Sequence, residues 1–199
     1  LAHEVDIALA AFDTQRAGRL LSTFIDDLSN WYVRRSRRRF WDGDPAALST
    51  LHEALRITTL CMAPFTPFIS ERVWQDLFRA TDPAAATSVH LAAWPEPAEA
   101  LVDPALAESM ALVRRVVELG RAARATSGVR TRQPLGRALV SASGWGRLSD
   151  ELRAEVCEEL NVGVIEALAD DTAGFVDTAI KANFRALGQR FGKQTPLVA

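Results

Sequence analysis

The sequence predicts a mainly α protein, in which a helical bundle is followed by a small α+β subdomain. Apolar residues recur at helical spacing across residues 14–40. Asp44-Pro45, Thr66-Pro67 and Asp103-Pro104 each place a capping side chain before a proline that suits the first helical position. After Arg137 short alternating runs appear, which are typical of strands. Helices joined by short turns indicate a bundle.

The bundle is expected to begin with the end of one helix, residues 1–11, followed by a central helix from about Thr14 to about Phe40. At 100° per residue the central helix has an apolar stripe within an arc of roughly 140°. The stripe consists of Ala17, Leu20, Leu21, Phe24, Ile25, Leu28, Trp31 and Tyr32. Beyond Tyr32 the same arc is continued by Arg35, Arg38 and Arg39.

This basic continuation carries five arginines and no acid between Trp31 and Trp41. A helix cannot bury unpaired guanidinium groups, so we expect its last turns to project past the core. Arginine binds phosphate bidentately and aromatic side chains stack on unpaired bases, which indicates RNA or another polyanion. A solvated helix end, whose arginines pair with acids of a neighbouring helix, is the open alternative.

The run FIDDLSNWYVRRSRRRFW, residues 24–41, resembles the anticodon-binding helical domain of isoleucyl-tRNA synthetases, which are class I aminoacyl-tRNA synthetases. On this interpretation Trp31 and Trp41 are candidates for stacking on a base, although Trp31 completes the apolar stripe and is therefore assigned to the core. Asn30 is a candidate for contact with a base edge or the backbone. The candidate phosphate contacts are Arg34, Arg35, Arg37, Arg38 and Arg39.

The next helices are expected over residues 45–62, capped by Asp44, and from Pro67 onwards, capped by Thr66. The stretch MAPFTPFISERVWQDL, residues 62–77, also resembles the synthetase family and is interpreted as scaffold. A connection rich in proline and alanine follows over residues 81–100, and we expect Trp94 to pack it onto the bundle.

A second basic block begins within the long helix that starts at Asp103-Pro104 and is expected to stop near Gly128. Between Arg114 and Arg137 there are seven arginines and one acid. Residues 120–140, GRAARATSGVRTRQPLGRALV, resemble a helix-to-strand junction of the same family. Contact with the RNA backbone is one hypothesis, for Arg121, Arg124, Arg130 and Arg132. Packing of these arginines against acids of the bundle, such as Asp26 or Asp27, is an equal alternative.

The last part is expected to contain a strand at 138–140, a helix opened by Ser149, a strand at 161–168 and a further strand at 174–177. We therefore divide the chain into a helical anticodon-binding bundle (1–80), a linker with a long helix (81–128) and a small α+β subdomain (129–199).

Composition excludes several classes of protein. A chain of 199 residues with 48% hydrophobic and 24% charged residues is globular, and a net charge of −2 confines nucleic-acid contact to local patches. The sequence contains no run of about 18 apolar residues, so no membrane span is predicted. Cys61 and Cys157 lie too far apart for a Cys-rich zinc site. The chain starts within helical sequence without Met, so we expect a fragment of a longer cytoplasmic protein.

No catalytic or metal-binding constellation can be found, and the HIGH-like and KMSKS-like strings of class I synthetases are absent. The resemblance implies the tRNA-binding region of an isoleucine–tRNA ligase, an enzyme that attaches isoleucine to its tRNA using ATP. Without the catalytic and editing domains, this chain alone is expected to be inactive.

The expected partners are the anticodon stem-loop of isoleucine tRNA and the remaining domains of the synthetase, with no membrane. No cofactor is expected in this stretch; the full-length family uses ATP with Mg, and Zn elsewhere in the chain is left open. Two alternatives stay open: the equivalent domain of a valyl- or leucyl-tRNA synthetase, and a helical protein-interaction module with an acidic partner.

Overall fold

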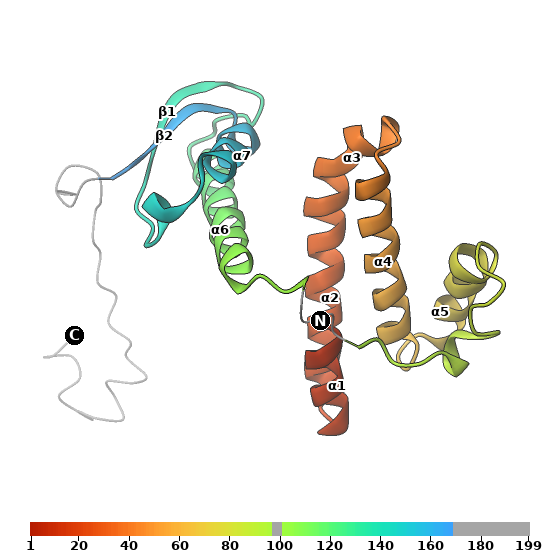
Figure 1. Ribbon diagram of the computed structural model, residues 1–199. Helices are drawn as coiled ribbons and strands as arrows, with labels where there is room; N and C mark the ends of the chain where they lie inside the picture. The colour runs from red at the N-terminus through yellow and green to blue at the C-terminus, as the bar shows by residue number, and fades with distance from the viewer. Residues whose placement is uncertain (97–100, 169–199) are drawn as a thin grey trace, which may run out of the picture. The chain divides into compact units, whose positions relative to one another are not determined.

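The computed structural model describes residues 1–96 and 101–168, and the chain divides into two compact units between Val102 and Asp103 (Figure 1). The first unit is helical, and the second combines helices with two strands, which confirms the predicted fold class. The division differs from the expected one in grouping the long helix with the α+β part rather than with the linker.

The first unit is built on a long, continuous helical column. Helix α1 (Ala2–Ala10) packs against α2 (Thr14–Asp27), which passes through a π-helical segment, η1 (Leu28–Val33), into α3 (Arg34–Trp41). Helix α4 (Pro45–Met62) returns beside this column in the opposite direction (Figure 1). The backbone stays helical at Asp27, Val33 and Arg34, so α2, η1 and α3 form one uninterrupted rod, as expected.

Local capping signals explain where some of these helices begin. Asp44 accepts hydrogen bonds from the backbone N–H groups of Ala46 (2.9 Å) and Ala47 (3.2 Å), which confirms it as the cap of α4. Thr66 occupies the N-cap position before Pro67, as expected, but the prediction that its side chain caps the helix is wrong. Its hydroxyl is directed back to the carbonyl of Met62 (3.3 Å) and forms no cap hydrogen bond.

The chain after α4 folds back onto the bundle. Helix α5 (Pro67–Val73) continues as the π-helical segment η2 (Trp74–Arg79), and a short 3-10 helix, η3 (Val89–Leu91), follows. Trp74 donates from Nε1 to the carbonyl of Ala86 (2.9 Å). The connection was expected to be a linker, but its described part, through residue 96, therefore belongs to the packed unit.

Two apolar clusters hold the first unit together. One joins α1, α2 and α4, and Trp94 packs against it as predicted. Its buried members are Ala2, Val5, Ala8, Ala17, Leu21 and Cys61. The other cluster joins α4 to the segments after it through Leu60, Ala63, Trp74, Phe78 and Val89.

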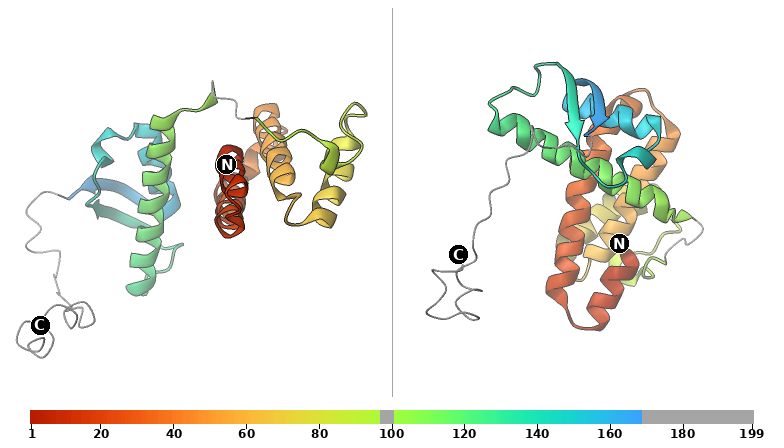
Figure 2. Two further views of the ribbon diagram at one scale, coloured as in Figure 1. Left: turned by 90° about the horizontal axis from the view of Figure 1, so that it is seen from below. Right: turned by 90° about the vertical axis from the view of Figure 1, so that its left-hand side faces the viewer.

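The second unit contains α6 (Pro104–Thr126), β1 (Leu135–Val140), the 3-10 helix η5 (Trp145–Arg147), α7 (Asp150–Leu160) and β2 (Val162–Ala167). The two strands are parallel, and α7 forms the connection between them. Helix α6 packs along α7 and lies beside the small sheet (Figure 2).

The local signals of the second unit are confirmed by the structure. Asp103 caps α6 by accepting from Leu106 N (2.9 Å), and Gly128, with φ of 67°, follows its end. Ser149 caps α7 by accepting from Leu152 N (3.3 Å). The strand predicted at 174–177 lies outside the described residues. Within the described ranges, no helix is long and apolar enough to cross a membrane.

Candidate nucleic-acid interface

The π-helical segment η1 decides which side chains of α3 face the core. A π turn closes its hydrogen bond one residue later than an α turn. Compared with a regular α-helix, every residue after the π turn is therefore rotated by one residue's step, about 100° around the helix axis. As a result, the core-facing positions of α3 are Ser36, which is only 5% exposed, and Phe40, which is half-buried.

The expectation that the apolar stripe continues into Arg35, Arg38 and Arg39 is therefore wrong. In an unbroken α-helix these arginines would continue the stripe, but the inserted residue turns Arg38 and Arg39 towards solvent and leaves Arg35 half-buried. Phe40 packs edge-to-face against Tyr32, with ring centroids 6.2 Å apart, so Phe40 occupies the position that the stripe assigned to arginine. The broader expectation, that α3 presents arginines to solvent, is confirmed, because four of its five arginines are exposed: Arg34, Arg37, Arg38 and Arg39.

The first arginines of α3 are engaged by neighbours on the same helix. Arg34 donates from Nε to the carbonyl of Asn30 (2.8 Å), and the Asn30 side chain lies in an exposed position. The guanidinium of Arg35 lies over the indole of Trp31, with Cζ 5.9 Å from the ring centroid. Both Arg35 and Trp31 are half-buried, so Trp31 contributes to the column as well as supporting an arginine.

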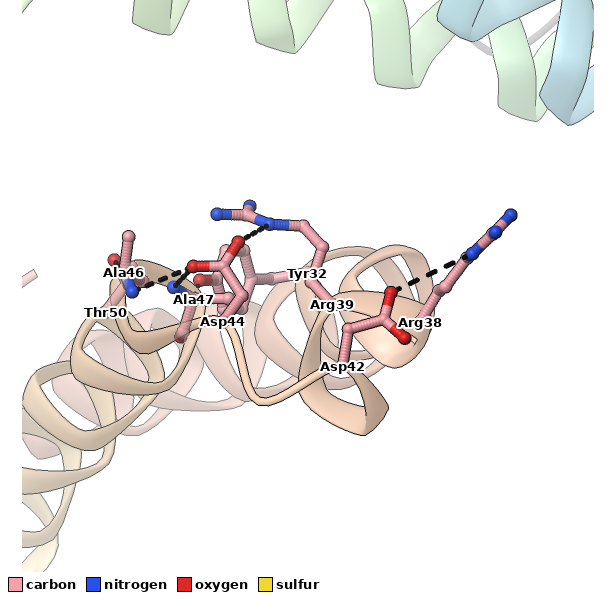
Figure 3. Close-up of polar contacts among 8 residues, drawn as sticks. All are labelled: Tyr32, Arg38, Arg39, Asp42, Asp44, Ala46, Ala47 and Thr50. Atoms are coloured by element: carbon pink, nitrogen blue, oxygen red, sulfur yellow. Dashed lines mark hydrogen bonds and ion pairs between the residues drawn. The ribbon is translucent and has the colours of Figure 1, made fainter.

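The end of α3 presents a basic and aromatic surface, which we call the α3 tip: Arg37, Arg38, Arg39 and Trp41 (Figure 3 shows Arg38 and Arg39). Trp41 is 85% exposed. Arg37 is exposed, and no hydrogen bond or ion pair from it is found within residues 1–96 and 101–168.

Two aspartates from the turn after α3 contact this surface. Arg39 donates from Nε to Oδ2 of Asp44 (2.8 Å), and this bond is the main cause that lowers the pKa of Asp44 and raises that of Arg39. Arg38 is 95% exposed and lies 3.9 Å from Asp42. Exposed pairs of this kind are weak. Asp44 therefore restrains Arg39, Asp42 holds Arg38 only loosely, and both arginines stay exposed to solvent. Both acids come from the following turn rather than from a neighbouring helix.

The second basic block contains one residue that the structure assigns to the fold. Arg124 is 6% exposed, and its guanidinium donates to the carbonyls of Arg130, Gln133 and Asn161, each at 3.0 Å. The structure argues against the hypothesis that Arg124 contacts RNA, because its guanidinium is buried and three of its five N–H donors already bind carbonyls.

The other arginines predicted in this block divide into a paired one and two exposed ones. Arg121 pairs with Glu159 of α7, whose side chain is 4% exposed. The partner of Arg121 therefore comes from the same unit, and not from Asp26 or Asp27 of the bundle, as the alternative expected. Arg130 and Arg132 are exposed in the loop that Arg124 holds. These two remain available for an anionic ligand.

Sequence reasoning missed two features of this surface. The π segment has no composition signal in the run Leu28–Val33, so the phase of α3 could not be read. The Arg39–Asp44 pair had a signal, since an acid follows the arginine by five residues across a turn, but Asp44 was interpreted only as a cap. No group of three or more potential metal ligands occurs in the part of the chain that the structure describes.

A helical bundle that ends in exposed arginines and a tryptophan defines a module suited to an anionic, aromatic partner such as RNA. The family described as the anticodon-binding domain of tRNA ligase matches residues 1–139. This match covers more than half of the chain, so the chain belongs to that family.

Similar proteins point to one member of the ligase group. The chain is 61% identical to an isoleucine–tRNA ligase of Streptomyces avermitilis and 60% identical to that of Streptomyces coelicolor, over the whole chain and 19% of each relative. It is 43% identical to the isoleucine–tRNA ligase of Thermus thermophilus, over the whole chain and 20% of that relative. The chain thus spans about a fifth of the length of these curated relatives.

Proposed function

We propose that this chain is the tRNA-binding region of an isoleucine–tRNA ligase and that the α3 tip holds the anticodon stem-loop of isoleucine tRNA. The observation that carries the proposal is the α3 tip itself, where exposed arginines lie next to an exposed tryptophan at the end of a continuous helix. The isoleucine assignment is supported by the names of the similar proteins.

The proposed mechanism is binding without bond chemistry in this chain. Arg37, Arg38 and Arg39 would contact phosphates and set the position of the stem-loop, since phosphate contacts carry no sequence information. Trp41 would stack on an unpaired base, and the exposed Asn30 would contact a base edge or the backbone. Arg130 and Arg132 of the second unit are further candidate phosphate contacts.

The proposal extends to the whole protein, in which other domains would join isoleucine to its tRNA with ATP and Mg in the cytoplasm. No cofactor is assigned to this chain. Ligase activity is assigned to the whole enzyme, and the 199-residue chain alone should have none.

The test is filter binding of the 199-residue chain to isoleucine tRNA at two salt concentrations. Replacing Arg37, Arg38 and Arg39 by alanine should weaken binding. It should also flatten the dependence of log K on log salt by roughly 0.7–0.9 per lost phosphate contact. A matched control replaces three exposed arginines of the same unit, Arg16, Arg19 and Arg72. Arg16 precedes Arg37 by 21 residues, or about 32 Å along a continuous helical rod.

The outcomes separate the alternatives. Unchanged binding by the tip variant, or an equal loss in the control, would show that the α3 tip is not the contact surface. A valine anticodon placed in the same tRNA should weaken binding to the unaltered chain. Equal binding to both anticodons would reduce the chain to a backbone-holding domain and contradict its role as an isoleucine anticodon reader.

A further inference from the structure

The carboxylate of Asp44 forms two sets of hydrogen bonds, one through each oxygen (Figure 3). Oδ1 accepts from the N–H groups of Ala46 and Ala47 and so caps α4, while Oδ2 accepts from Nε of Arg39. The carboxylate cannot rotate without losing one of the two sets. It therefore links the orientation of an α3 side chain to the start of α4.

The start of α4 is itself fixed by further hydrogen bonds. Tyr32 of η1 donates from its hydroxyl to the carbonyl of Ala47 (3.0 Å), and Thr50 donates to the carbonyl of Ala46 (2.8 Å) (Figure 3). The backbone at Ala46 and Ala47, which Asp44 caps, is thus tied to the helical column through Tyr32. Asp44 therefore offers Arg39 a partner at a defined position.

The contact with Asp44 uses only one edge of the Arg39 guanidinium. Arginine has five N–H donors in a planar fork, and Asp44 engages the single donor on Nε. No hydrogen bond from either Nη of Arg39 is found among the described residues, and the side chain is 51% exposed. The Nη edge, which is the edge that can bind a phosphate through two parallel hydrogen bonds, therefore faces solvent in a restrained orientation.

We propose that Asp44 is a positioning residue for RNA binding, which holds Arg39 so that its Nη edge meets a phosphate of the anticodon stem-loop. This inference rests on the function proposed above. Arg38 provides the contrast within the same surface, because its Nε lies 3.9 Å from Asp42 and its side chain is 95% exposed. Asp42 therefore leaves the orientation of Arg38 open.

Removing the charge of Asp44 should change RNA affinity in opposite directions, depending on whether Asp44 positions Arg39 or only caps α4. A carboxylate next to an RNA-binding surface repels phosphate, so removing its charge should tighten binding if Asp44 only caps a helix. If Asp44 positions Arg39, removing the charge should weaken binding instead, because Arg39 must then be immobilised when the RNA binds.

The experiment measures binding of the anticodon stem-loop of isoleucine tRNA to the 199-residue chain and to its Asp44→Asn and Asp44→Ser variants. Asparagine and serine are good N-caps, so α4 should keep its start while the ion pair is lost. Far-UV circular dichroism and thermal unfolding check that the fold is retained. We expect affinity to fall roughly two- to ten-fold, the range for immobilising one long side chain. Asp42→Asn, a matched removal of one charge, should leave affinity unchanged or raise it.

The Arg39→Ala background completes the test. If Asp44 acts through Arg39, Asp44→Asn should no longer weaken binding once Arg39 is alanine. A loss that persists in that background, or unchanged or tighter binding by the folded single variants, would overturn the positioning role and leave the proposed function standing. Failure of the unaltered chain to bind the stem-loop at low salt would overturn the proposed function, and the positioning role with it.

Discussion

Replacing Arg124 by methionine should destabilise the second unit and leave the first unit folded. The methionine fills a similar volume but removes the donors that satisfy the carbonyls of Arg130, Gln133 and Asn161. A hydrogen bond from a charged donor contributes about 1.5–3 kcal/mol, and such contributions are not additive. Some of these carbonyls can regain water, because their loop is largely exposed. We therefore expect a loss of about 3–5 kcal/mol, a large part of the stability of a small domain.

Hydrogen exchange followed by mass spectrometry measures this loss in each unit separately. Peptides from β1 and β2 should lose protection in the Arg124→Met variant, while peptides from α4 should not change. The matched control is Arg130→Met on the adjoining loop. Its side chain is exposed, so its effect on stability should stay below about 0.5 kcal/mol.

The competing hypothesis for Arg124 makes the opposite prediction. If Arg124 contacted RNA from the surface, its replacement would lower RNA affinity and leave hydrogen exchange in β1 and β2 unchanged. That result would refute the reasoning from burial, and it would return Arg124 to the RNA-contact residues together with Arg130 and Arg132.

Two further predictions test the first unit. Ser36→Gln should lower the free energy of unfolding in urea by about 1–3 kcal/mol, because it enlarges a buried side chain, whereas the exposed Arg37→Gln should change it by less than about 0.5 kcal/mol. Equal effects at the two positions would contradict the rotation that the π segment imposes on α3. Burial raises the pKa of the Cys61 thiol to about 11, so above about pH 8.5 the unfolded chain releases this proton before the folded chain does. Stability should then fall as pH rises from 8.5 towards 11, and Cys61→Ala should show a smaller fall in pH-dependent urea unfolding; identical slopes would contradict the raised pKa.

Much of the fold could be predicted because its signals are local. Asp44, Asp103 and Ser149 cap helices through hydrogen bonds to N–H groups two or three residues further on, so the residues themselves carry the information. Thr66 shows the limit of such signals. Its side chain could either cap the helix that follows or donate to the carbonyl of Met62 in the helix before it, and the structure shows the second. The sequence does not say which of these two hydrogen bonds forms.

The sequence predicted which residue types gather at the candidate site, but only partly which of those side chains face solvent. That arginines and tryptophans gather near residues 31–41 is plain in the sequence. Which of them face solvent depends on the π segment, which shifts the helix phase without a distinctive residue pattern. Sequence periodicity therefore assigned Arg35 to a position that Ser36 occupies, and it could not reveal that Phe40 pairs with Tyr32.

The sequence by itself determined the starts of the main helices, the two basic blocks and the resemblance to the anticodon-binding family, because each depends on residues that are close together along the chain. The tertiary structure alone decided the roles of Arg121 and Arg124. The partners of Arg124 lie 6, 9 and 37 residues away, and that of Arg121 lies 38 residues away. An arginine becomes part of the fold or part of a binding surface according to the acceptors that folding brings to it, and spacing along the chain does not encode those.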